Sequence, residues 1–81
     1  MKARVQVMLK NGVLDPQGKA IENSLSGLGF AGIDDVRMGK VIELNIAEND
    51  ADKARTQITE MCEKLLANTV IERYDIDLED G

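Results

Sequence analysis

The sequence contains no histidine and only one cysteine, Cys62, among its 81 residues. Without histidine, the serines at 24 and 26 lack the usual general base of nucleophilic catalysis, and a zinc site would lack its usual ligands. A single cysteine cannot form an intrachain disulfide, and it fits a reducing compartment. The composition therefore argues against nucleophilic catalysis and against stabilisation by a structural zinc.

Aromatic residues and positive charge are also scarce. Phe30 and Tyr74 are the two aromatic residues, and the net charge is −5. Nucleic-acid binders need a basic surface and often aromatic stacking platforms, and anionic membranes attract basic proteins. No apolar run is long enough to cross a bilayer, and the N-terminus does not resemble a signal peptide. We therefore expect a soluble, cytoplasmic protein with no nucleic-acid or membrane partner.

Four segments alternate apolar and polar side chains, a period of two that predicts β-strands. Residues 3–9 form the first segment and residues 71–78 the last. Between them, residues 33–38 and 41–46 flank Gly39, which is expected to supply a tight turn. The two middle segments are therefore interpreted as a β-hairpin.

Two helices are expected from their start signals and apolar spacing. Asp15 can cap free N–H groups, and Pro16 loses no hydrogen bond at a first helical position. The second helix begins at Asp50 and ends by Asn68. Apolar stripes at three- and four-residue spacing indicate the buried faces, Ile21, Leu25 and Leu28 in the first helix and Ala51, Ala54, Ile58, Met61, Cys62, Leu65 and Leu66 in the second.

The resulting order is β-α-β-β-α-β within a single domain of residues 1–81. Right-handed crossovers applied to this order predict an α+β, ferredoxin-like sandwich with a four-stranded antiparallel sheet and both helices on one face. A core this small, with a mixed polar sheet face and strand edges to protect, favours a homodimer or a dimer of dimers. The sequence leaves open whether edges or faces would pair.

The residues that could carry chemistry are better explained by structural roles. Cys62 lies on the apolar stripe of the second helix, as expected for an inert core thiol. The acids before that helix do not match a calcium loop and suit a helix N-terminus. The acids that end the chain, Asp80 among them, suit a solvated strand face and terminus. No glycine spacing matches a phosphate-binding loop. We therefore expect no catalytic, cofactor or metal site.

Two turns are the candidate partner-binding sites. The first places apolar side chains in a loop beside a helix start, which indicates either a hydrophobic staple or a contact loop. The second is a basic tip on an acidic chain, where Arg37 could hold a partner carboxylate or pair with Glu43 or Asp75 of the sheet. The pattern does not require the two turns to be adjacent. The candidate residues are Val13, Leu14, Asp15, Gln17, Lys19, Arg37, Gly39 and Lys40.

The first turn also carries a family resemblance. Residues 9–21, LKNGVLDPQGKAI, closely resemble the first strand, loop and helix of the PurS family. The similarity continues through VRMGK at 36–40, IEL at 42–44, MCEKLLAN at 61–68 and VIE at 70–72. Thr69 departs from the family pattern, because many members have proline there. The resemblance covers essentially the whole chain.

PurS is the small subunit of phosphoribosylformylglycinamidine synthase. The resemblance implies a large, PurL-type synthetase partner that uses ATP and magnesium to activate formylglycinamide ribonucleotide. It also implies a PurQ-type glutaminase partner that releases ammonia. The small subunit would bring these partners together for ammonia transfer, without catalytic residues or a bound cofactor of its own. The alternative is an amino-acid-binding regulatory domain of the ACT type, which has the same element order.

Overall fold

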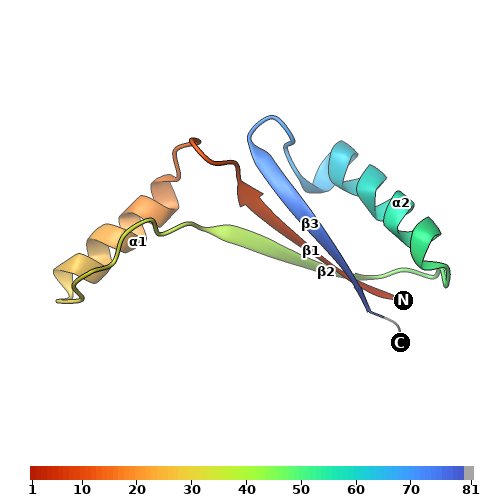
Figure 1. Cartoon of the computed structure of the whole chain (residues 1–81), viewed down its shortest axis with the longest axis horizontal. Helices are drawn as coiled ribbons and strands as arrows, with labels where there is room; N and C mark the ends of the chain where they lie inside the picture. Colours follow the sequence, from red (N-terminus) through yellow and green to blue (C-terminus); the bar gives the residue numbers. More distant parts are fainter. Residues whose placement is uncertain (80–81) are drawn as a thin grey trace.

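The computed structural model describes residues 1–79 and shows an α+β fold with one antiparallel sheet (Figure 1). The strands are β1 (Lys2–Leu9), β2 (Gly39–Asn45) and β3 (Glu72–Glu79), in the order β2-β1-β3. The helices are α1 (Pro16–Gly27) and α2 (Ala51–Met61), and α2 continues into a π-helical turn, η1 (Cys62–Leu66). The alternating segments 3–9 and 71–78 are thus confirmed as strands.

The core lies between the sheet and α2. Ala3, Val5 and Val7 of the central strand are buried, and they pack against Ile58 and Cys62. Val5 has apolar neighbours on both sides, because it pairs with Ile42 of β2 and Ile76 of β3. The opposite face carries exposed polar side chains, as the period of two predicts.

Helix α2 and the turn that follows it are more exposed than the apolar stripe suggests. Asp50 caps it as expected, since its Oδ1 accepts hydrogen bonds from the N–H groups of Asp52 at 2.9 Å and Lys53 at 3.3 Å. The backbone N–H of Ala67 donates to the carbonyl of Cys62, five residues earlier, at 3.1 Å. This wider turn changes the helical phase. Leu65 is 83% exposed, so the predicted burial of this residue is wrong.

The predicted four-stranded sheet is also wrong, because the described residues contain three strands. Residues 33–38 do not pair with a strand, and β2 begins at Gly39 without a tight turn. Strand β1 is already paired on both edges. The segment before Gly39 is instead held beside α1, where the N–H of Met38 donates to the Asp15 side chain. The ferredoxin-like hairpin therefore does not form.

Helix α1 does not cover the sheet, so the prediction that both helices lie on one face is wrong. Figure 1 shows α1 beyond the end of the strands, with residues 28–38 returning alongside it, while α2 lies at the other end of the molecule. We call residues 16–37 the arm. Within α1 only Gly18 is buried. The chain consequently extends over 49 × 28 × 15 Å.

Candidate partner-binding site

The two predicted turns meet at the junction between the arm and the sheet. Asp15 joins them, because its Oδ1 accepts a hydrogen bond from the N–H of Gly18 at 2.8 Å and its Oδ2 accepts one from the N–H of Met38 at 2.7 Å. These backbone hydrogen bonds hold the pKa of Asp15 below its ordinary value, since they favour the charged carboxylate. The cap of α1 therefore also fixes the start of β2.

Arg37 ties the same junction to the end of β1. Its Nη2 donates to the carbonyl oxygens of Leu9 at 2.7 Å and Lys10 at 3.1 Å. The predicted alternative, in which Arg37 pairs with Glu43 or Asp75 of the sheet, is therefore wrong. Glu43 instead pairs with Arg4 at 3.2 Å and Lys2 at 3.6 Å, and Asp75 pairs with Arg73 at 3.4 Å. Arg37 thus sets the position of the second turn.

Two glycines allow the chains of the junction to approach closely. A side chain at Gly18 would collide with the carbonyl oxygen of Val36, which lies across the arm. A side chain at Gly39 would collide with the sulfur of Met8 and lie 2.8 Å from the carbonyl oxygen of Val7. These glycines therefore serve backbone packing rather than turn formation.

Two hollows adjoin the junction. One has a volume of about 350 Å³, and the other, at the end of the inner sheet face, has about 170 Å³. Lys19 lines the larger hollow and donates to Oε2 of Glu22 at 2.9 Å. This hydrogen bond lowers the pKa of Glu22 and raises that of Lys19, because each charge stabilises the other. The larger hollow is lined by Gly12, Val13, Leu14, Asp15, Lys19, Glu22, Asp35, Val36 and Arg37, and the smaller by Val7, Leu9, Asp15, Gln17, Met38, Gly39, Lys40 and Glu72.

The candidate residues divide into exposed and positioning groups. Gln17, Lys19 and Lys40 are exposed, and Leu14 is 76% exposed. A hydrophobic staple would bury the residue before the cap, so this interpretation is wrong for Leu14. Val13, Asp15 and Arg37 are half-buried within the junction, and Gly39 packs on β1. The half-buried residues hold the junction together, and the exposed residues lie on its surface.

A second surface was missed by sequence reasoning. An apolar groove of about 620 Å³ lies between β2 and the end of α2. Met61 and Leu65 were assigned to the core because they continue the apolar stripe of α2. The groove is lined by Ile42, Leu44, Gln57, Glu60, Met61, Lys64, Leu65 and Leu66.

The remaining titratable groups offer no obvious reaction centre. Burial raises the pKa of the Cys62 thiol, and the nearby Glu63 raises it further, so its thiolate is disfavoured. Among residues 1–79, no cluster of three or more potential metal-ligating side chains occurs. None of the helices in this part of the chain has the length and apolarity required to span a membrane. The exposed surfaces therefore define a small α+β domain suited to contact with other proteins.

Comparison with known proteins identifies the family. Residues 2–80 match the family model PurS, described as phosphoribosylformylglycinamidine (FGAM) synthase. The chain is 48% identical over 79 residues to the phosphoribosylformylglycinamidine synthase subunit PurS of Bacillus subtilis, covering 98% of this chain and 93% of that protein. The corresponding protein of Methanocaldococcus jannaschii is 41% identical over 78 residues, covering 96% and 94%.

Solved structures agree in fold as well as sequence. M. jannaschii PurS, described as a subunit of formylglycinamide ribonucleotide amidotransferase, superposes with a TM-score of 0.88 at 42% identity, covering 99% of this chain and 96% of that one. A chain in the structure of PurLQS from Thermotoga maritima gives 0.84 at 32% identity, covering 94% and 93%. The chain belongs to the PurS family, and the resemblance seen in the sequence is confirmed.

Proposed function

We propose that this chain is the non-catalytic small subunit of a phosphoribosylformylglycinamidine synthase, in which it links the synthetase to the glutaminase. The complex would convert formylglycinamide ribonucleotide, ATP and glutamine to the amidine product. The observation that carries this proposal is the match of residues 2–80 to PurS, supported by the similarity to a chain of the PurLQS structure. Ammonia released at one site must reach another without loss, so a subunit that fixes the two partners favours transfer.

In this proposal the cofactors belong to the large subunit, which would bind ATP and magnesium. The N-terminus of α1 is a poor phosphate site, because the N–H of Gly18 already donates to Asp15. The chain would act in the cytoplasm, with the rest of the complex. The ACT-type alternative gains no specific support, since the described residues form a three-stranded sheet without its hairpin.

The proposed contact surface consists of the exposed junction residues, Leu14, Gln17, Lys19 and Lys40. Their charge supports a complementary partner, because Lys19 and Lys40 provide ammonium groups on an acidic protein. Val13, Asp15, Arg37 and Gly39 would act by positioning this surface. Truncation of an exposed lysine leaves these internal contacts in place.

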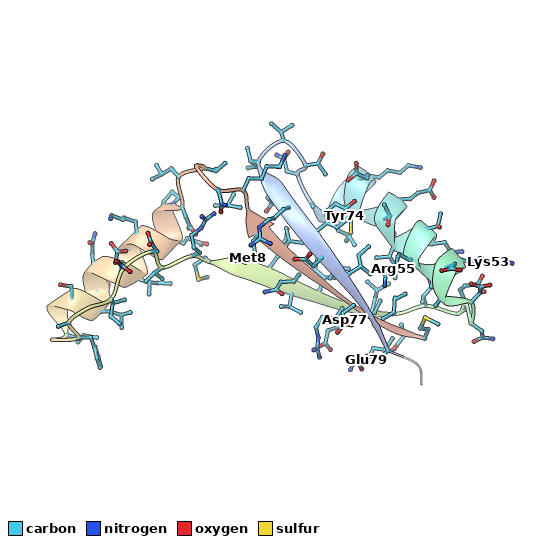
Figure 2. The ribbon with its side chains drawn as sticks, in the orientation of Figure 1. Met8, Lys53, Arg55, Tyr74, Asp77 and Glu79 are labelled. Carbon is cyan, nitrogen blue, oxygen red and sulfur yellow. The ribbon has the colours of Figure 1, made fainter. Side chains whose placement is uncertain are left out.

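Assembly of the three purified proteins tests the proposal. Size-exclusion chromatography with scattering should show one complex that contains this chain, a PurL-type synthetase and a PurQ-type glutaminase. Lys19→Ala combined with Lys40→Ala should weaken assembly about tenfold or more, as loss of interface charge pairs often does. Lys53→Ala is the matched control, because Lys53 is exposed on α2 (Figure 2). Equal assembly of both variants would reject this surface, and assembly without the chain would reject the linking role.

A further inference from the structure

The loop between β1 and α1 begins with a turn that contains Asn11 and Gly12. The N–H of Val13 donates to the carbonyl oxygen of Lys10 at 3.2 Å, and Gly12 has a φ of 87°. A turn with a positive φ at its third residue favours glycine there, because other side chains are strained in that conformation. The geometry of the turn therefore places a glycine directly after an asparagine.

This pair leaves the Asn11 side-chain amide open to attack by the backbone nitrogen of Gly12. Glycine has no Cβ to hinder the approach of its own nitrogen. Asn11 is exposed, and a side chain at Gly12 would meet nothing within 4 Å beyond its chain neighbours. The N–H of Gly12 donates no hydrogen bond within residues 1–79. Neither crowding nor a hydrogen bond within these residues holds the nitrogen away from the side chain.

The four other asparagines of the chain are better protected. The N–H of Ser24, which follows one of them, lies inside α1. The N–H of Ile46 donates to the carbonyl of Met1 at 2.8 Å, and that of Asp50 donates to Oε1 of Glu48 at 3.1 Å. In each of these cases the attacking nitrogen is held in a hydrogen bond or within a helix. The four asparagines are Asn23, Asn45, Asn49 and Asn68.

The Asn11 turn also supports the anchor of the arm. The carbonyl oxygen of Lys10 accepts the hydrogen bond from Val13, and it also accepts one from Nη2 of Arg37 at 3.1 Å. A change in the main chain at residue 11 would alter the position of this carbonyl group. The arm depends on the turn for this reason.

We propose that Asn11 deamidates spontaneously and that its isoaspartyl product opens the turn that anchors the arm. The backbone nitrogen of Gly12 forms a bond to Cγ of Asn11, while the bond from Cγ to Nδ2 breaks. The proton of Gly12 N leaves with Nδ2 as ammonia. Water then opens the cyclic imide. Opening at Cγ gives aspartate, and opening at the backbone carbonyl carbon gives isoaspartate, whose main chain runs through Cβ and Cγ.

The isoaspartyl product lengthens the main chain between Lys10 and Gly12 by one carbon. The N–H of Val13 then no longer meets the carbonyl of Lys10, and Arg37 loses one of its two acceptors. The modification is independent of the proposed linking role, because it requires neither the synthetase nor the glutaminase.

Intact-protein mass spectrometry during incubation in warm, mildly alkaline buffer tests the site. The native protein should gain the mass difference between an amide and a carboxylic acid. Asn11→Gln should gain it at least several-fold more slowly, because its longer side chain would have to close a larger ring. Asn68→Gln is the matched control and should keep the native rate, because Asn68 is also exposed but the β-branched Thr69 follows it.

Two results of this experiment would overturn the proposal. One is an equal rate of mass gain in the native protein and in Asn11→Gln. The other is a native protein that gains the mass only after unfolding in urea, since the folded turn would then protect Asn11.

Enzymatic methylation and hydrogen exchange test the effect on the turn. An isoaspartyl methyltransferase with a labelled methyl donor should label the incubated native protein but not Asn11→Gln. Deamidated chains carry an additional negative charge, so anion exchange separates them from unmodified chains. The isoaspartyl fraction should exchange the Val13 amide at least several-fold faster. The amide of Ala54, which donates to the carbonyl of Asp50 in α2 at 2.9 Å, should be unchanged. Absence of methyl label, or unchanged exchange at Val13, would overturn the proposal.

Discussion

The side chain of Asp15 accepts a hydrogen bond from the backbone N–H of Met38 at 2.7 Å, across a separation of 23 residues. The same carboxylate caps α1 through Gly18. One side chain therefore sets both the start of the arm and its return to the sheet. The proposed partner surface and the position of the arm depend on this contact.

Replacement of Asp15 by asparagine should loosen the arm. An amide has one acceptor oxygen, so either the N–H of Gly18 or that of Met38 loses its partner. Hydrogen exchange should become at least several-fold faster at one of these amides. Asp50→Asn is the matched control, because a single oxygen of Asp50 accepts both capping hydrogen bonds of α2. Unchanged exchange at both Gly18 and Met38 would show that the carboxylate does not hold the junction.

Low pH should destabilise the junction, because it protonates the Asp15 carboxylate. The folded-state pKa of Asp15 lies below its ordinary value of 3.8, so the folded protein favours the charged form. This stabilisation is fully present above about pH 4 and is lost as the pH falls through the lower folded pKa. Urea unfolding between pH 7 and pH 2.5 should show a smaller acid-induced loss for Asp15→Asn than for the unsubstituted protein. Parallel profiles would contradict this role of Asp15.

Substitution of Arg37 should affect both the stability of the fold and partner binding, whereas substitution of Lys19 should affect partner binding alone. Arg37→Ala removes the hydrogen bonds to the carbonyls of Leu9 and Lys10, so it should lower the melting temperature and weaken complex assembly. Lys19→Ala should weaken assembly with little change in melting temperature, because the Lys19 side chain is 64% exposed and an exposed ion pair contributes little stability. If Lys19→Ala lost as much thermal stability as Arg37→Ala, this division of roles would be incorrect.

Cys62 should behave as a core residue. It is fully buried, and its thiol pKa is raised by burial. A thiol reagent should react slowly with the native protein and rapidly in denaturant. Cys62→Ser should cost about 1–3 kcal/mol more in unfolding free energy than Cys62→Ala if the buried hydroxyl lacks a partner. Rapid native labelling at neutral pH would contradict burial of the thiol.

The sequence predicted the elements whose signals are local. Asp15 and Asp50 are confirmed as caps, and the alternation around Val5 and Ile76 correctly assigned the inward faces of two strands. Caps and strand alternation depend on residues that are close in the sequence, so a short segment is enough to predict them.

The position of the arm could not be predicted in this way. The alternation of residues 33–38 is typical of a strand, but the contact between Asp15 and Met38 places this segment beside α1. The apolar stripe of α1 predicted burial against the sheet, yet Leu28 is largely exposed in the single chain. The groove was missed because a π-helical turn, which no pattern announced, carries Leu65 out of the core.

The two predicted turns lie together in the structure, although their spacing gave no reason to place them together. Arg37 connects them through the end of β1. The partners of Arg37 are the backbone carbonyl oxygens of Leu9 and Lys10, and backbone atoms carry no sequence signal. The exposed members, such as Lys19, remain a prediction for partner binding.

The most direct test of the proposed linking role is glutamine-dependent synthesis by the purified synthetase and glutaminase, with and without this chain. The account predicts that product formation from glutamine requires the chain, while synthesis by the synthetase from added ammonium salt does not. This comparison separates ammonia transfer from the chemistry of the synthetase itself. Equal glutamine-dependent rates with and without the chain would contradict the account.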